Sequence, residues 1–404
     1  MRVTSNSLEP GLMPLLPPQR HLFDLPAEVA YFNSAYYSPQ LNESRVRLSA
    51  GAASKSCPWE RTARSFFQDA ETIRRLSSEI FGGEADGYAV VPAASYGLST
   101  AARAIEPHLH RGDRILVVAE EFPSNVLPWI RTAQVSGAVL DTLPAPGRGS
   151  WAQAIVEHIG KGVKVVAVST CHWTNGALID LLPIARACRE VGAALVVDAT
   201  QSLGAMPLSI DEVAPDFLVA AGYKWLLCPY GFGLLYVSER WRDSRPLEET
   251  WLARANAEDF TALSVYSDVY LPGARRFDAG EKCVPTVLPG AIAALEQIQA
   301  WGVARIAQSL LEINQSIALH LEQLGFRLPD PAARCPHLLG AQLPAHCSNN
   351  LVAELSAKKV FISQRANAIR IAPHLHITAQ DTARLLEALS EVVPNAAARS
   401  ARQE

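Results

Sequence analysis

Short, continuously apolar segments alternate with longer segments of helical period through much of the chain. The apolar segments are 89–91, 114–119, 163–169, 194–198, 217–220 and 233–237. Helical spacing of apolar residues follows two of them, at 95–105 and 181–191. Strands that alternate with helices in this way are typical of a mostly parallel sheet covered by helices. We therefore expect an α/β fold with a doubly wound sheet.

The last third of the chain has a different pattern. Helical period returns at 291–301 and 305–324, and a final helix is expected at 378–393, with a few short strands before it. The length of 404 residues suits two domains. We predict an N-terminal segment (1–40) that packs with the small domain, a large ligand-binding domain (41–288) and a smaller α+β domain (289–404).

Composition excludes several classes of protein. The chain is 49% hydrophobic and 19% charged, with a formal net charge of −4, which is typical of a globular protein and does not suggest nucleic acid as a partner. No apolar stretch approaches the roughly 18 residues of a membrane helix, so no membrane association is predicted. The segment 1–20 lacks the features of a signal peptide. The seven cysteines are scattered without a Cys-x-x-Cys pair, so we expect no metal site, no disulfide framework and a reducing, cytoplasmic environment.

Two ionisable residues follow predicted strands. Asp198 ends the segment 194–198, and Lys224 comes shortly after the segment 217–220. Residues just past strand ends line the ligand crevice of an open α/β sheet. Alone, such an Asp is most often a turn or helix cap, and such a Lys is usually a solvated surface residue. Together they match the needs of pyridoxal phosphate, which uses a lysine for its Schiff base and an acid to keep its ring nitrogen protonated.

Residues after two other predicted strands suit the same cofactor. Ser95, with the backbone of Ala94 and Tyr96, lies where a helix begins, and a helix N-terminus suits a phosphate. A plain Ser N-cap is the simpler interpretation of Ser95. Phe122 is placed to stack on a planar ring, or else it is an ordinary core residue.

Polar residues near Asp198 and Lys224 extend the candidate site. The segment 169–176 offers Thr170 and Trp173, unless it is only a polar turn closed by its Asn-Gly pair. Gln201 is placed to hydrogen-bond the phenolic oxygen of the cofactor, with Thr170 as the second candidate. Tyr223, next to Lys224, is placed to reach the phosphate.

These motifs resemble the class V aminotransferase family of fold-type I pyridoxal-phosphate enzymes, the group of cysteine desulfurases and isopenicillin-N-epimerase-like proteins. The likeness covers nearly everything from residue 31 to about 389. Its main motifs are Val197-Asp198-Ala199-Thr200-Gln201, Gly222-Tyr223-Lys224-Trp225 and Pro229-Tyr230-Gly231-Phe232-Gly233, with further matches at 122–129, 276–281 and 369–374. The resemblance implies the catalytic Schiff-base lysine at Lys224, and cofactor contacts at Asp198, Gln201, Ser95 and Phe122.

The resemblance also implies residues for the substrate and a partner. Arg370 falls where the family binds the substrate carboxylate, a planar anion that suits an Arg fork; otherwise it is a surface arginine. Asn33 falls near the substrate entry. The family implies a homodimer with shared active sites, in which the segment around Gly280 and Glu281 reaches the neighbour's site.

The chain departs from parts of this family. The segment 365–370, between two arginines, is short and has no Cys, so the persulfide chemistry of the desulfurases is not expected. Gln201 replaces the His of the kynureninases. Ala221 stands where many relatives place a phosphate-binding Ser, and Glu281 stands where some place a Thr.

The expected function is that of an enzyme that binds an amino acid as an external aldimine and forms a carbanion at Cα, with Lys224 as the base. Transamination is the first choice. The alternative is C–S lyase activity by β-elimination on a cysteine conjugate. Epimerisation or decarboxylating carbon–carbon bond formation ranks third. A non-catalytic binder of pyridoxal phosphate is least favoured, and a Rossmann nucleotide site lacks its Gly-x-Gly-x-x-Gly motif.

Overall fold

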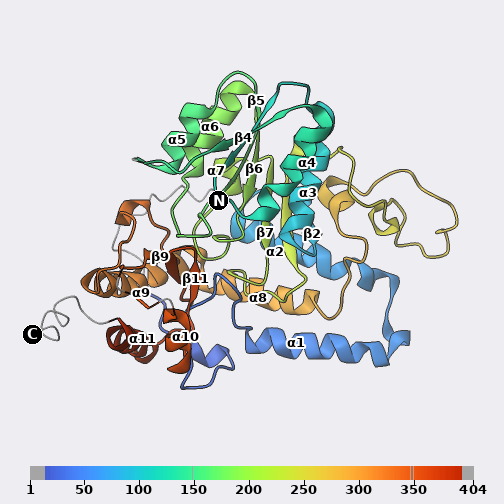
Figure 1. Ribbon diagram of the computed structural model, residues 1–404. Helices are drawn as coiled ribbons and strands as arrows, with labels where there is room; N and C mark the ends of the chain where they lie inside the picture. The colour runs from blue at the N-terminus through green and yellow to red at the C-terminus, as the bar shows by residue number, and fades with distance from the viewer. Residues whose placement is uncertain (1–13, 148, 346, 349, 394–404) are drawn as a thin grey trace, which may run out of the picture.

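A seven-stranded sheet forms the centre of the protein, whose computed structural model describes residues 14–147, 149–345, 347–348 and 350–393 (Figure 1). The strand order is β2-β8-β7-β6-β5-β3-β4. β8 runs in the opposite direction to the other six strands, so its pairs with β2 and β7 are antiparallel. The strands are β2 (Tyr88–Val91), β3 (Arg114–Val118), β4 (Val139–Leu143), β5 (Val163–Ser169), β6 (Ala194–Asp198), β7 (Phe217–Ala221) and β8 (Gly233–Val237).

Helices cover both faces of this sheet, which explains why the inner strands β6 and β7 are buried at every position. Successive strand residues point to opposite faces. Leu116 packs with one core, together with residues of α2, α5, α6 and α8, whereas the next residue, Val117, packs with a second core under α3 and α4 (Figure 1). The helices are α1 (Asn42–Ala53), α2 (Gln68–Phe81), α3 (Ala94–Ile105), α4 (Leu127–Ser136), α5 (Trp151–His158), α6 (Leu181–Val191), α7 (Ile210–Val213) and α8 (Leu288–Trp301).

The sequence pattern predicts six of the seven strands and misses β4. This strand lies at the edge of the sheet and pairs only with β3. Val139 is exposed, and Asp141 and Thr142 interrupt the apolar run. An edge strand that is half solvated has no continuous apolar signal, so its pairing is visible only in the structure.

The last third of the chain builds a separate core. It contains α9 (Val303–Gln323), β9 (Leu339–Gln342), α10 (Leu351–Ala357), β10 (Val360–Phe361), β11 (Ser363–Arg365), β12 (Ala368–Ile371) and α11 (Ala379–Val392). The antiparallel sheet β11-β12-β9 packs against helices in this core. These helices and short strands agree with the expected α+β region, which lies at the lower left of Figure 1.

The N-terminal residues contact this region. The short strand β1 (Ala30–Tyr31) pairs parallel with β10, and Arg20 forms an ion pair of 2.9 Å with Asp381. Residues 1–13 of the predicted N-terminal segment lie outside the described residues.

The helix α8 packs on α1, where Ser44 Oγ donates to Gly290 O at 2.9 Å. The boundaries after residues 40 and 288 stay a prediction.

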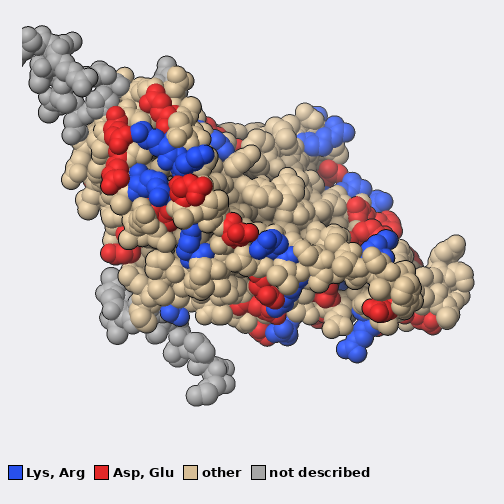
Figure 2. Space-filling model, turned by 90° about the horizontal axis from the view of Figure 1, so that it is seen from below, with Lys and Arg blue, Asp and Glu red and all other residues tan. Residues whose placement is uncertain are grey.

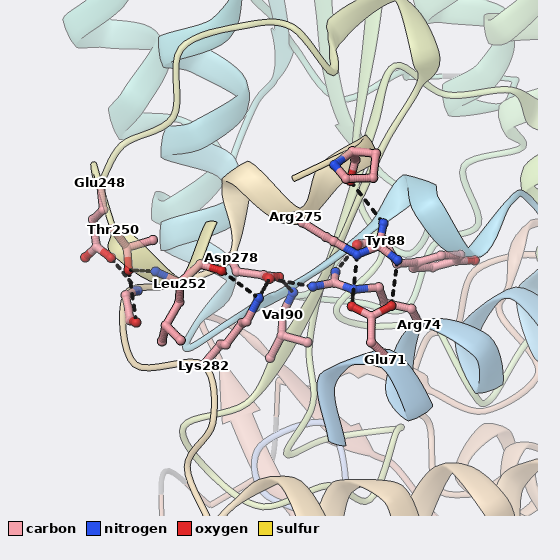
Figure 3. Close-up of polar contacts among 12 residues, drawn as sticks. Glu71, Arg74, Tyr88, Val90, Glu248, Thr250, Leu252, Arg275, Asp278 and Lys282 are labelled. Atoms are coloured by element: carbon pink, nitrogen blue, oxygen red, sulfur yellow. Dashed lines mark hydrogen bonds and ion pairs between the residues drawn. The ribbon is translucent and has the colours of Figure 1, made fainter. Parts of the chain in front are cut away.

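A buried ion network ties the segment 273–282 to α2 and β2 (Figure 3). Asp278 pairs with Arg74 and, at 2.8 Å, with Lys282, and each of these side chains is 1% exposed. The Val90 amide donates to Asp278 Oδ1 at 2.8 Å. Burial opposes ionisation, but the charges of Arg74 and Lys282 hold the pKa of Asp278 below its ordinary value. The network therefore fixes the segment that leads into Gly280 and Glu281.

The surface carries acidic and basic side chains together. Figure 2 shows both kinds mixed across one face of the molecule, in line with the small net charge of −4. None of the helices in the described ranges combines the length and the apolar character needed to cross a membrane.

We expect Arg74→Met to destabilise the protein by about 3–5 kcal/mol, because it leaves the buried Asp278 carboxylate without its main partner. Urea unfolding followed by circular dichroism measures this loss. Arg75→Met is the matched control, since Arg75 is the next residue of α2 and pairs with Glu79 on the surface. An equal effect of both variants would contradict a stabilising role of the network.

Candidate active site

A pocket opens at the carboxyl ends of the neighbouring parallel strands β3, β5, β6 and β7. This is the edge of an open α/β sheet where ligands bind. The lining residues are the last residues of β5 and β6 and residues of the loops that follow β3, β5, β6 and β7. They are Glu121, Phe122, Ser169, Cys171, Trp173, Asp198, Thr200, Gln201 and Lys224.

Lys224 provides a buried amine in this pocket. It is only 7% exposed. Burial lowers the pKa of Lys224 to about 8, against the opposing attraction of the Asp198 carboxylate. A lysine that is partly unprotonated near neutral pH is suited to form a Schiff base or to take up a proton. Its Nζ lies 5.5 Å from the centre of the Phe122 ring.

Asp198 provides the carboxylate. It is the last residue of β6, and its Oδ1 accepts a hydrogen bond of 2.9 Å from the Thr200 amide. Burial raises the pKa of Asp198, while the hydrogen bonds from Thr200 and the charge of Lys224 act in the opposite direction. A buried carboxylate at the end of a strand suits a protonated ring nitrogen of a ligand.

Phe122 and Trp173 form an aromatic wall. Their ring centres are 5.4 Å apart with the planes at 80°. The Trp173 indole is held by a hydrogen bond of 2.7 Å to Glu120 O. Phe122 is 36% exposed, which contradicts the interpretation as an ordinary core residue. Its position at the pocket instead suits stacking on a planar ligand.

The helix α3 presents its N-terminus without a side-chain cap. Ala93 is the N-cap residue and makes no capping hydrogen bond, so the interpretation of Ser95 as an N-cap is wrong. Ser95 is exposed at the second helical position. A Cβ at Gly97 would lie 2.8 Å from Val219, so glycine lets this first turn approach β7 closely. Free amides of Ala94 and Ser95 at a helix start suit a phosphate.

The structure places Gln201 in the pocket wall with both ends of its amide bonded. Its Nε2 donates to Ala35 O, and its Oε1 accepts from Trp225 Nε1, both at 3.0 Å. These bonds fix the side chain while leaving one N–H free.

Thr170 and Tyr223 do not reach the pocket lining. The Thr170 hydroxyl is hydrogen-bonded to Ser202. The Tyr223 ring packs against Tyr37 and Tyr230, with centres 5.6 and 4.7 Å away. The chain bends at Thr170, just after β5, and turns at 173–175. Ser169, Cys171 and Trp173 line the pocket, whereas Thr170 and His172 do not. His172 stacks on Trp151, which agrees with a structural histidine.

Arg370 and Asn33 carry unsatisfied buried atoms. Arg370 is 1% exposed, which contradicts the interpretation as a surface arginine. Its Nη1 donates to Trp173 O at 2.7 Å and its Nε to Ser363 Oγ at 3.2 Å. Within the described part of the chain, neither Arg370 Nη2 nor Asn33 Oδ1 has a hydrogen-bond partner. A buried guanidinium nitrogen of this kind suits a ligand carboxylate.

The sequence analysis missed four lining residues, which are Glu121, Ser169, Cys171 and Thr200. Glu121 lies in the loop that follows β3 and is buried. Cys171 is a buried thiol, and Thr200 accepts a hydrogen bond of 3.1 Å from the Ala221 amide. The signal for Glu121 and Cys171 was their place beside Phe122 and Trp173 at strand ends. Their inward orientation depends on the loop backbone.

Comparison with known proteins places this chain in a family. The family model for aminotransferase class-V matches residues 48–382. A probable cysteine desulfurase of Pyrococcus abyssi is 28% identical over 257 residues, which is 64% of this chain and 63%, slightly under two thirds, of that protein. An uncharacterised aminotransferase of Bacillus subtilis is 26% identical over 313 residues, which cover 77% of this chain and 80% of that protein.

Solved structures have the same fold. The cystine C–S lyase C-DES, in complex with its reaction product cysteine persulfide, superposes with a TM-score of 0.82 at 20% identity, over 91% of this chain and 99% of the lyase. At this identity the likeness concerns the fold.

The chain therefore belongs to the aminotransferase class-V family, a family of enzymes that depend on pyridoxal phosphate. The expected family, fold class, cofactor and general enzyme class are confirmed. The individual site residues stay predictions.

We expect Asp198→Asn to lower the pKa of Lys224 below its value of about 8, because the Asp198 carboxylate stabilises the ammonium form. Competitive acetylation of the cofactor-free protein across pH, read by mass spectrometry of the Lys224 peptide, gives this midpoint. Asp180→Asn is the control, since Asp180 caps α6 and Asn also serves as a cap. A midpoint that Asp198→Asn leaves in place would contradict the coupling.

Proposed function

We propose that this chain binds pyridoxal phosphate at Lys224 and removes the proton from Cα of an amino acid, most simply in a transamination. The observation that carries this proposal is the buried Lys224 amine opposite Asp198 in one pocket. The unpartnered Arg370 Nη2 supports an amino-acid substrate, because it offers a site for a carboxylate.

The residues present fit the cofactor. Lys224 would hold its aldehyde carbon, Asp198 would hold its ring nitrogen, and Phe122 would stack on its ring. The uncapped start of α3, with Ser95, suits its phosphate. When bound, the cofactor supplies an electron sink for negative charge at Cα.

Lys224 is the base that the pocket offers for the Cα proton. With a pKa of about 8, about one amine in ten is unprotonated at pH 7. Phe122 has no proton to exchange, and both ring nitrogens of His172 are occupied, one by Thr174 Oγ1 and one by Ala119 O. Arg370 orients the substrate through its carboxylate, which decides which Cα bond faces the amine.

A second candidate function is β-elimination of a cysteine conjugate. It is favoured by the likeness to the cystine C–S lyase C-DES. It also agrees with the segment 365–370, which has no Cys for persulfide transfer. Amino-acid formation that requires a keto acid supports transamination, whereas release of pyruvate and a thiol without a co-substrate supports the lyase. Epimerisation and decarboxylating bond formation rank below both.

We further propose a homodimer in a reducing, cytoplasmic compartment. The loop 255–270 projects from the body at the right of Figure 1 and exposes apolar side chains, among them Val265, Tyr266 and Val269. Exposed apolar groups of this kind suit burial against a second copy. The seven cysteines are all free, which suits a reducing compartment.

We expect Lys224→Ala to abolish covalent cofactor attachment and to slow Cα-proton exchange by about 10²–10⁴-fold. Borohydride reduction followed by peptide mapping shows the attachment, and loss of the Cα–H signal in deuterated water shows the exchange. Lys161→Ala, at an exposed position, is the control and retains both. A pyridoxyl label on a peptide other than that of Lys224 would defeat the assignment.

A further inference from the structure

Glu121 is a second buried carboxylate in the pocket that contains Asp198. The residue before it, Glu120, has a left-handed backbone with φ of 56°. This conformation is costly for a residue other than glycine, so surrounding contacts must maintain it. The turn directs Glu121 inward directly after β3, while the Glu120 side chain stays exposed.

The Glu121 carboxylate joins two loops of the site. Its Oε1 accepts from the Phe122 amide at 2.7 Å, and its Oε2 accepts from the Ser169 amide at 3.1 Å. Ser169 ends β5 and pairs in register with Asp198 on β6. One carboxylate thus connects the aromatic residue of the pocket to the strand position beside the pocket's acid.

The loop after β5 also binds the loop after β3 through its own side chains. Trp173 Nε1 donates to Glu120 O at 2.7 Å, and His172 Nε2 lies 3.2 Å from Ala119 O. Side chains after β5 therefore bind the backbone after β3, and Glu121 returns a bond to the backbone of β5. Removal of Glu121 leaves the Phe122 amide without its hydrogen-bond acceptor, and this bond helps to hold the residue that carries the ring.

The ionisable groups around Glu121 come from three other strand ends. They are Asp198 after β6, Lys224 after β7 and Cys171 after β5. Burial and the charge of Asp198 raise the pKa of Glu121 to about 7, although its two amide hydrogen bonds favour the ionised form. Above that pH Glu121 is mainly ionised, and below it Glu121 is mainly protonated.

We propose that Glu121 is a positioning residue of the cofactor site, which fixes the Phe122 ring and adds its negative charge to that of Asp198 in attracting a cationic ligand ring. The inference rests on the proposed function, because it takes pyridoxal phosphate as the ligand. Two substitutions address the two effects. Gln at this position has the size of Glu without its charge, but its single acceptor oxygen serves only one of the two amides at either pH, so the pH-dependent part of its effect reports the charge. Asp has the charge without the reach to both amides.

The test is the affinity for pyridoxamine 5'-phosphate, which forms no Schiff base with Lys224. Calorimetric titrations at pH 6.0 and 8.5 compare the unsubstituted protein with Glu121→Gln. We expect Glu121→Gln to weaken binding on the order of tenfold at pH 8.5, as for one pKa unit of coupling, and much less at pH 6.0. Glu120→Gln is the matched control, with unchanged affinity at both pH values.

Glu121→Asp tests the geometric part. We expect it to keep the pH dependence of affinity and to change the induced visible circular dichroism of bound pyridoxal phosphate, since the Phe122 ring loses its anchor. Equal weakening of Glu121→Gln at both pH values, or no weakening, would overturn the proposal. Failure of the unsubstituted protein to bind either vitamin form would instead overturn the proposed function and this inference with it.

Discussion

A single lysine amine, buried opposite a carboxylate at the edge of a parallel sheet, sets the conditions for the rest of the site. A buried ammonium is costly, so its pKa falls to about 8. Asp198 limits this fall because it attracts the charged form. The same carboxylate is itself buried. Both groups can remain in the interior because the strands β6 and β7 hold them at neighbouring ends.

The pocket is completed from two separate cores. Arg370 belongs to β12 in the C-terminal region, yet its Nη1 binds the backbone oxygen of Trp173 in the loop after β5. Gln201, at the other wall, binds Ala35 O, and Ala35 packs in the core of the large sheet. A displacement between the two regions would therefore move Arg370 relative to the loop that carries Trp173. The geometry depends on contacts between the cores as well as within each.

The wall beside Lys224 restricts where protons can move. Phe122 contributes an aromatic face without an ionisable group, and His172 is turned away into contacts with Trp151 and Ala119 O. Lys224, Glu121 and Cys171 are left as the groups of this pocket able to exchange a proton near neutral pH.

The sheet and its reactive pair could be predicted from local pattern, because strands buried on both faces have continuous apolar runs and Asp198 and Lys224 follow two of them. Side-chain direction beyond a strand end could not. Ser169 and Cys171 line the pocket and Thr170 does not, because the chain bends at Thr170 and only the loop backbone decides which side chains point inward. Tyr223 packs on two tyrosines, one of them brought in from the distant N-terminal residues. The inward turn of Glu121 needs the left-handed Glu120, which contacts from another loop maintain.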